Sequence, residues 1–335
     1  MIAQTSRRNL LFVLGLAFAL ILLASLAYHS STLLPIINRF SQSPTSTTSG
    51  SSRIRDGPIT YIPFTFGWAM LLQTLRGYQI SDWPNLVIVD NSWDGYAYEE
   101  KDMLRDMYGV IDVIPTPVRL RFAQIQAFMD KIAADSVAPM YFWSHTDILL
   151  VPNGPDTYGR AMDAVHRWDI NGTLGVLHFA YDLLSAVTAK AGKIAPWDPA
   201  MPQYGSDCDR YMRLKLAGMH ATDNGERIAE IIHLHSVLSE DEMERLYDDT
   251  EDVQERVRIV RELNDAREQY AWRYGGEGDG REGITEMDVK AKYAEEQGGR
   301  LYFEAKWGQI EELCELDDRT PAFDLASYVD TKDRR

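Results

Sequence analysis

Hydrophobic positions in the middle of the chain follow two periods in turn, one typical of strands and one typical of helices. Leu86–Val89 and Val110–Ile114 are continuous apolar runs, as expected of strands that are buried on both faces. Phe122–Ala134 instead carries its apolar side chains at helical spacing. Further strands are expected at Ile59–Phe64, Met140–Trp143 and Ile148–Val151. Strands that alternate with helices predict an α/β fold, with a mostly parallel sheet flanked by helices.

The first fifty residues have a different pattern. Asn9–Tyr28 carries no charge and follows Arg7 and Arg8. At about 1.5 Å per residue this stretch would span the hydrocarbon core of a bilayer, so it predicts a transmembrane helix. The two arginines predict a cytosolic N-terminus and a luminal remainder. The alternative is a cleaved signal peptide with its cleavage site near Ala24–Ala27, although the apolar part of such peptides is usually shorter.

The segments on either side of the α/β pattern differ from it in composition. Residues 41–52 are almost entirely Ser, Thr, Pro and Gly, which predicts a flexible stalk. Ser239–Glu242 has the pattern of a capping box and opens a charged helical region. The predicted organisation is a cytosolic tail (1–8), a transmembrane anchor (9–28), a stalk (29–57), an α/β domain (58–238) and a helical C-terminal region (239–335).

Composition excludes two classes of protein. The chain of 335 residues has 50 acidic and 34 basic side chains and a net charge of −16, and such a surface repels phosphate backbones, so no nucleic-acid partner is expected. Two cysteines exclude a disulfide scaffold. Cys208 and Cys314 could bridge in an oxidising lumen, and the sequence leaves this pairing open. Asn171 begins an Asn-Gly-Thr sequon, which fits a luminal domain that carries N-linked sugar.

Polar residues follow two of the predicted strands, at the edge of the sheet where ligands bind in open α/β folds. Asp90 and Asn91 come directly after a buried strand, and the carboxylate could accept hydrogen bonds from a ribose or a base. The alternative is that both residues only form a turn. His145 and Asp147 lie two residues apart in an extended segment, so they point the same way and could share one divalent cation. The alternative here is a solvated polar break between strands.

A third group lies farther along the chain. Ser206 precedes Asp207 and Asp209, which fall in the first turn of a predicted helix, where the helix dipole stabilises negative charge. Arg213 lies four residues after Asp209 on the same helical face, and Gly218 suits the C-terminal cap. A well-capped acidic helix without catalytic function would show the same pattern.

In order and spacing these groups resemble the GT-A-fold glycosyltransferases, nearest to the family 2 group, over about residues 58–238. The strand that ends in Asp90–Asn91 matches the nucleotide contact of that family, and His145–Asp147 lies where the family has an Asp-x-Asp metal motif. The block from Asp207 to Gly218 matches an acidic pair that runs into Asp-x-x-x-Arg-x-x-x-x-Gly. Two positions depart from the family, because His145 and Ser206 stand where acids are usual.

The resemblance implies a GT-A-like, Rossmann-like domain that moves a hexosyl group from a sugar nucleotide to a hydroxyl of a glycan, glycoprotein or glycolipid, by an inverting single displacement. The cofactor it implies is a divalent cation, Mn2+ in the first place and Mg2+ as the alternative. It assigns the catalytic base to Asp207, the metal to Asp147, His145 and His235 (preferred over His233), the donor to Pro63, Asp90 and Asn91, and the acceptor to Asp209 and Trp197. Asp209 could instead only cap its helix, and Trp197 could instead pack in the core.

The expected setting is a single-pass type II membrane protein of the Golgi or endoplasmic reticulum, with the catalytic domain in the lumen and the membrane contacted through the N-terminal helix. The departure at His145 motivates an alternative function, a catalytically inactive, membrane-anchored glycosyltransferase-like protein that binds ligands or scaffolds partners. A hydrolytic metalloenzyme is a more distant alternative.

Overall fold

The fold is taken from a computed structural model, which describes residues 57–247 except 137, 170, 181–182, 202–204, 225–226 and 235–236, and also 255, 258–259 and 286–307. The chain divides into two units, Met1–Gly50 and Ser51–Arg335, and every described residue belongs to the second. The predicted transmembrane anchor and almost all of the stalk therefore lie outside the described residues. Among the helices that are described, none is both long enough and apolar enough to cross a membrane.

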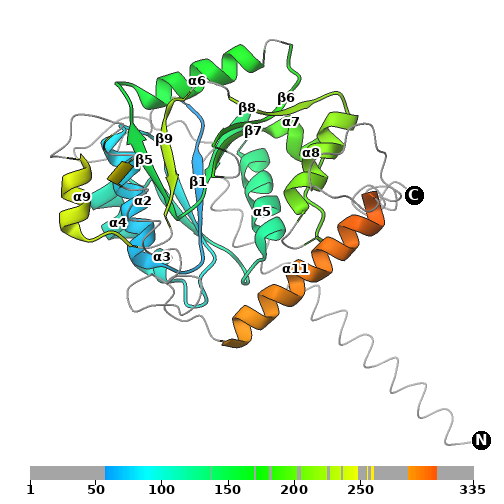
Figure 1. The fold of residues 1–335 in the computed structure, drawn as a ribbon, viewed down its shortest axis with the longest axis horizontal. Helices are drawn as coiled ribbons and strands as arrows, with labels where there is room; N and C mark the ends of the chain where they lie inside the picture. The colour runs from blue at the N-terminus through cyan, green and yellow to red at the C-terminus, as the bar shows by residue number, and fades with distance from the viewer. Residues whose placement is uncertain are drawn as a thin grey trace, which may run out of the picture. The chain divides into compact units, whose positions relative to one another are not determined.

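A seven-stranded sheet forms the centre of the second unit (Figure 1). Its strands, in spatial order, are β3 (Asp112–Pro115), β2 (Leu86–Asp90), β1 (Thr60–Phe64), β4 (Met140–Ser144), β7 (Leu184–Thr188), β6 (Leu174–Ala180) and β8 (His220–Asp223). The neighbouring strands from β3 to β4 are parallel, as are β6 and β8, whereas β7 is antiparallel to both of its neighbours. The mixed α/β class with a mostly parallel sheet is confirmed.

Helices cover both faces of this sheet. The described helices are α2 (Trp68–Ile80), α3 (Tyr96–Glu99), α4 (Lys101–Tyr108), α5 (Phe122–Asp135), α6 (Thr157–Trp168), α7 (Ala189–Ile194), α8 (Ser206–Leu216), α9 (Glu240–Tyr247) and α11 (Glu286–Trp307). Figure 1 shows α2 and α4 on one side of the sheet and α5 and α8 on the other. All five residues of β2 are buried, as its continuous apolar run predicts for a strand covered on both faces.

A second, two-stranded sheet holds the segment after β4. β5 (Ile148–Pro152) does not extend the central sheet but pairs antiparallel with β9 (Ala229–His233). Apolar side chains of β5 and β9 pack against α9 in a separate cluster that includes Leu149, Ile232 and Leu246. The capping box at the start of α9 is confirmed, because the Ser239 amide donates to Glu242 Oε2 over 2.7 Å and the Glu242 amide donates to Ser239 Oγ over 3.3 Å.

The helix α11 packs on α8 through an apolar cluster and a buried charged group. Phe303 and Trp307 of α11 belong to one buried apolar cluster with Cys208 and Met212 of α8. Next to this cluster, the fully buried Lys306 ammonium lies between two buried carboxylates of the α/β domain. α9 and α11 are helical, as expected for the C-terminal region, and the boundary at residue 238 stays a prediction.

Candidate metal centre

The site is built on the short connection between β4 and β5. β4 runs parallel to β1, so its carboxyl end lies at the same edge of the sheet as the carboxyl ends of β1, β2 and β3. His145, Thr146 and Asp147 form the connection and follow Ser144 directly. In open α/β sheets this edge is where ligands bind.

Hydrogen bonds hold the backbone of this connection from several sides. The buried Thr74 hydroxyl of α2 lies 2.7 Å from the carbonyl oxygen of Thr146 and 2.8 Å from that of Ile148. The His145 amide donates to the carbonyl oxygen of Leu183 over 2.9 Å. The connection is therefore fixed to α2 and to the neighbouring hairpin, and its side chains start from a defined backbone.

His233 reaches the same place from a distant part of the sequence. It is the last residue of β9, and it lies opposite Ile148 in the antiparallel pair. The amide of Leu234 donates to the carbonyl oxygen of Asp147 over 2.7 Å, which ties the two strand ends together. The next segment is held by Gln73 of α2, whose side chain hydrogen-bonds both the amide and the carbonyl of Leu238.

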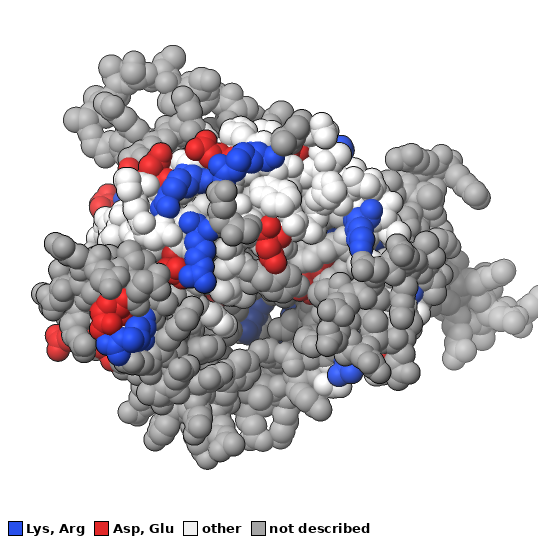
Figure 2. Space-filling view, turned by 45° about the horizontal axis from the view of Figure 1, so that its top comes forward, with Lys and Arg blue, Asp and Glu red and all other residues white. Residues whose placement is uncertain are grey.

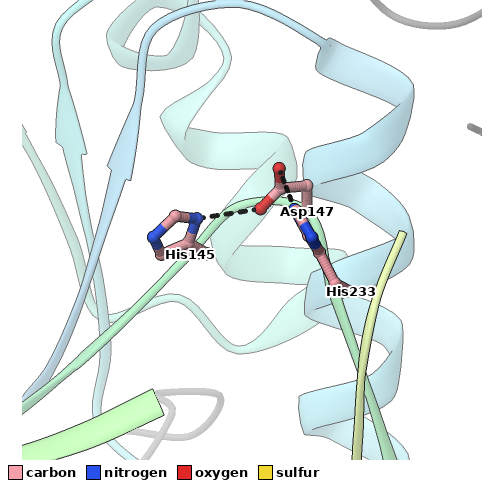
Figure 3. Close-up of side chains that lie close together, drawn as sticks. All are labelled: His145, Asp147 and His233. Carbon is pink, nitrogen blue, oxygen red and sulfur yellow. Dashed lines mark hydrogen bonds and ion pairs between the residues drawn. The ribbon is translucent and has the colours of Figure 1, made fainter. Parts of the chain in front are cut away.

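Three side chains converge at these strand ends (Figure 3). Asp147 Oδ1 lies 3.1 Å from His145 Nδ1, and Asp147 Oδ2 lies 3.0 Å from His233 Nε2. One ligand atom from each side chain can be chosen so that all three lie within 4.8 Å of one another. The side chains are 30 to 40% exposed, so solvent and small ions reach them.

The electrostatics of the group favour an ionised carboxylate. Burial raises the pKa of Asp147, but the hydrogen bonds from His145 and His233, together with the charge of their rings, outweigh burial and hold the pKa well below its usual range. Metal binding needs a deprotonated carboxylate and neutral imidazoles. A cation that replaced the protons between Asp147 and the two rings would find this donor set, so the residues present fit a divalent transition metal.

The prediction that His145 and Asp147 act together agrees with their placement in one group. The histidine that joins them among the described residues is His233. His235, which the sequence analysis preferred, lies outside the described residues, and its role stays a prediction. His233 carried a sequence signal only as one of two histidines at a plausible distance, because nothing local indicates that β9 pairs with β5.

Asp90 and Asn91 are bonded to the loops around them. Asp90 accepts hydrogen bonds from the Ser92 amide and hydroxyl on Oδ1 and from the Tyr98 amide on Oδ2. The Asn91 side chain bonds the amide and carbonyl of Leu120 and, in addition, two threonine hydroxyls. Both residues are buried, and these contacts are those of turn formers. Their contact with a donor stays a prediction, as does that of the half-buried Pro63 in β1.

The two acids at the start of α8 have different surroundings. Asp207 is half-buried in the first turn. Asp209 is fully buried and accepts from Arg213 Nε over 2.9 Å, from Trp307 Nε1 over 2.9 Å and from Lys306 Nζ over 2.7 Å. Both oxygens of Asp209 are therefore engaged by side chains of the protein. Its contacts join α8 to α11 and agree with a structural role.

The remaining predicted residues lie in different surroundings. Trp197 is 5% exposed and packs edge-on against Phe122, with the Arg210 guanidinium 4.8 Å from its ring centroid, as expected of core packing. Asn171 is exposed in a turn, where a glycan would have room. Cys208 is disulfide-bonded, whereas the other cysteine of the chain, Cys314, lies outside the described residues.

Comparisons with known proteins give likenesses among solved structures and none among family models or curated sequences. No family model matches the chain, and no curated protein matches it. Among solved structures, it is similar to the mannosyltransferase PcManGT from Pyrobaculum calidifontis, determined in complex with GDP-Man and Mn2+. The sequence identity is 11%, the match covers 83% of this chain and 92% of that chain, and the TM-score is 0.41. A likeness at this level does not define the activity of the present chain.

Proposed function

We propose that the protein is a metal-dependent glycosyltransferase, which moves a sugar from a sugar nucleotide to a hydroxyl group of a glycan, glycoprotein or glycolipid. The observation that carries the proposal is the convergence of His145, Asp147 and His233 at the carboxyl edge of the parallel sheet. The reaction class comes from the resemblance of the Asp207–Gly218 block to the glycosyltransferase motif. The donor sugar and the nucleotide are left open.

Each of the three side chains has a role at the cation. Asp147 supplies an ionised carboxylate at neutral pH, because its pKa is held low by the two rings. His145 and His233 supply one ring nitrogen each, on opposite oxygens of that carboxylate. A bound divalent cation supplies positive charge against the diphosphate leaving group.

Asp207 is the proposed general base. Its carboxylate would take the proton from the acceptor hydroxyl as the acceptor oxygen bonds to the anomeric carbon and the bond from that carbon to the diphosphate oxygen breaks. Such a single displacement inverts the configuration at the anomeric carbon. Asp209 lies two residues after Asp207 in the same helical turn, but it is fully buried and ion-paired. It would hold α8 in place rather than contact the acceptor.

The proposed setting is the lumen of the secretory pathway, with the apolar stretch at residues 9–28 as a type II anchor in the Golgi or endoplasmic reticulum membrane. The disulfide at Cys208 supports an oxidising compartment, since cytosolic proteins rarely keep such bonds. The exposed position of Asn171 in a sequon supports the same side of the membrane.

A second candidate function is a glycosyltransferase-like protein that binds a sugar nucleotide without turnover. The observation that favours it is His145, which stands where the resembled family has an acid. Consumption of the sugar nucleotide distinguishes the two functions, because only an enzyme converts the donor to product.

The test of the proposed function is turnover by the full chain in detergent. Turnover is measured as release of the free nucleoside diphosphate from a panel of sugar nucleotides in the presence of Mn2+. Asp207→Asn is expected to lower the rate by about 100-fold or more, since it removes the base but keeps the shape. The matched control is Asp106→Asn, at an exposed position of α4. An unchanged rate in Asp207→Asn would remove Asp207 from the mechanism, and no turnover with any donor would favour the binding function.

A further inference from the structure

The helix α11 contacts the chain on both sides of the proposed base, Asp207. Its residue Lys306 is fully buried, and the ammonium lies 3.0 Å from Asp198 Oδ2 and 2.7 Å from Asp209 Oδ1. Asp198 belongs to the segment that leads into α8, and Asp209 belongs to the first turn of α8. One cation of α11 therefore joins both segments, and Asp207 lies between them in sequence.

Two aromatic side chains of α11 strengthen this contact. Trp307 Nε1 donates to Asp209 Oδ1 over 2.9 Å, so the indole and the Lys306 ammonium reach the same carboxylate oxygen. Phe303 is fully buried and packs at Gly205, the N-cap of α8, where a Cβ would lie 3.2 Å from the Phe303 ring. In Figure 1, α11 is the orange helix below α8. It thus contacts both the N-cap and the first turn of α8.

The charges of the buried group balance one another. Lys306 and Arg213 oppose the carboxylates of Asp198 and Asp209, and Arg213 Nε donates to Asp209 Oδ2 over 2.9 Å. All four side chains are at most 7% exposed. Any other arrangement of α8 and α11 would leave a buried charge without its partner, which is costly. The group therefore restricts the two helices to one relative position.

We propose that Lys306 and Trp307 are positioning residues for Asp207. They hold Asp209, which lies two residues after Asp207 in the same helical turn, and so they set where the Asp207 carboxylate lies. Neither residue contacts a reacting atom, because both act through Asp209. The inference rests on the proposed function, in which Asp207 is the base. It makes the C-terminal helix a part of the catalytic arrangement.

Trp307→Phe tests the proposal without removing a buried charge. The variant keeps an aromatic ring and deletes the hydrogen bond to Asp209. We expect kcat to fall by about fivefold or more, with the KM for the donor within about twofold of the natural value, because a displaced base slows the chemical step and not donor binding.

The matched control is Trp83→Phe. It deletes an equally buried hydrogen bond, from Trp83 Nε1 to Thr60 Oγ1 over 2.8 Å, at the amino end of β1 and so at the opposite edge of the sheet from the candidate metal centre. Its kcat should stay that of the natural chain. The same kcat in Trp307→Phe and Trp83→Phe would overturn the proposal.

A double variant separates positioning from stability. Lys306→Met leaves two buried carboxylates without their cation, so it should lower both the unfolding midpoint and kcat. Adding Asp198→Asn removes one of the two charges, so part of the unfolding midpoint should return. The contact between Lys306 and Asp209 is still missing, so kcat should stay at least about tenfold below the natural value. Recovery of kcat in parallel with the midpoint would show that the group only stabilises the fold, and would overturn the proposal.

Hydrogen exchange tests the inference apart from turnover. The Asp209 amide donates to the carbonyl oxygen of Gly205 over 2.9 Å, so its exchange rate reports on the first turn of α8. This rate should rise by about fivefold or more in Trp307→Phe and stay unchanged in Trp83→Phe. If no donor is turned over but the rate rises in this way, the proposed function is wrong and the hold of α11 on this turn stands. If the natural chain turns over a donor and neither kcat nor exchange differs between the two variants, the inference is wrong and the proposed function stands.

Discussion

At the scale of single residues, partners and not residue type decide what each acid can do. Asp147 has two imidazoles for neighbours and keeps an ionised carboxylate within reach of solvent. The carboxylate oxygens of Asp90 accept hydrogen bonds from amides and a hydroxyl of its own loop. Those of Asp209 accept hydrogen bonds from side chains of α8 and α11. The three acids look alike in sequence, yet Asp147 is the one whose surroundings suit a cation.

A buried histidine outside the site predicts a specific dependence of stability on pH. His178 is 3% exposed, its Nδ1 lies 2.7 Å from Ser185 Oγ, and its ring packs edge-on against Tyr211. Burial lowers the pKa of His178 to about 4, so the folded protein keeps the ring neutral where the unfolded chain would bind a proton. As the pH falls from about 6.5 towards 4, the free energy of unfolding should therefore fall by up to roughly 3 kcal/mol.

This prediction is checked by chemical denaturation at several pH values between 7 and 4, for the natural chain and for His178→Gln. The comparison uses only the change of the free energy of unfolding with pH, because the substitution itself changes the absolute stability. The natural chain should lose more stability than His178→Gln over this window, and parallel curves would contradict the assignment.

Which site residues the sequence could predict depends on how far apart they lie along the chain. His145 and Asp147 are two residues apart, and their period in an extended segment predicts that they face one way. His233 lies 86 residues after Asp147, so only the pairing of β9 with β5 brings it to the site. Neither Thr74 nor Lys306 has a local pattern that indicates its role, because each acts on groups far away in sequence.

At the scale of elements, the strands with continuous apolar runs were predicted best. β2 and α5 match the expected segments within one or two residues, since the first is an unbroken apolar run and the second has a clear helical period. The segment at Ile148–Val151 is a strand as expected, but it belongs to the second sheet. Strands β6 to β9 were not predicted; β6, for example, contains Gly175 and His178, which break the apolar pattern.

The junction between α8 and α11 predicts a large effect on stability. Lys306 Nζ lies 3.0 Å from Asp198 Oδ2 and 2.7 Å from Asp209 Oδ1, and all three side chains are fully buried. Lys306→Met removes the cation and leaves two buried carboxylates without it, which should lower the free energy of unfolding by about 3–5 kcal/mol.

Thermal or chemical unfolding of Lys306→Met measures this effect. Lys131→Met is the matched control, because Lys131 pairs with Asp135 on an exposed helical face and should cost at most about 1 kcal/mol. Adding Asp198→Asn to Lys306→Met should recover part of the loss. A loss in Lys306→Met no larger than in Lys131→Met would show that α11 does not depend on this group.

At the scale of the whole molecule, the net charge of the chain does not describe the charge at the candidate site. The chain carries a net charge of −16, yet Figure 2 shows basic side chains interspersed with acidic ones among the described residues of the face it presents. The acid excess therefore says little about the site, where a single carboxylate lies between two rings. The anchor at residues 9–28 and the luminal setting are predictions from sequence, and they explain why a disulfide at Cys208 would persist.

The central claim is that His145, Asp147 and His233 hold a cation that binds a sugar nucleotide. The most direct measurement is the thermal unfolding midpoint of the full chain with a panel of sugar nucleotides, with and without Mn2+, for the natural chain and Asp147→Asn. At ligand concentrations about 100 times the dissociation constant, binding adds about 2.7 kcal/mol to the free energy of unfolding. We expect at least one donor to raise the midpoint only when Mn2+ is present, and Asp147→Asn to abolish that rise. No rise with any donor, or an equal rise in Asp147→Asn, would contradict the claim.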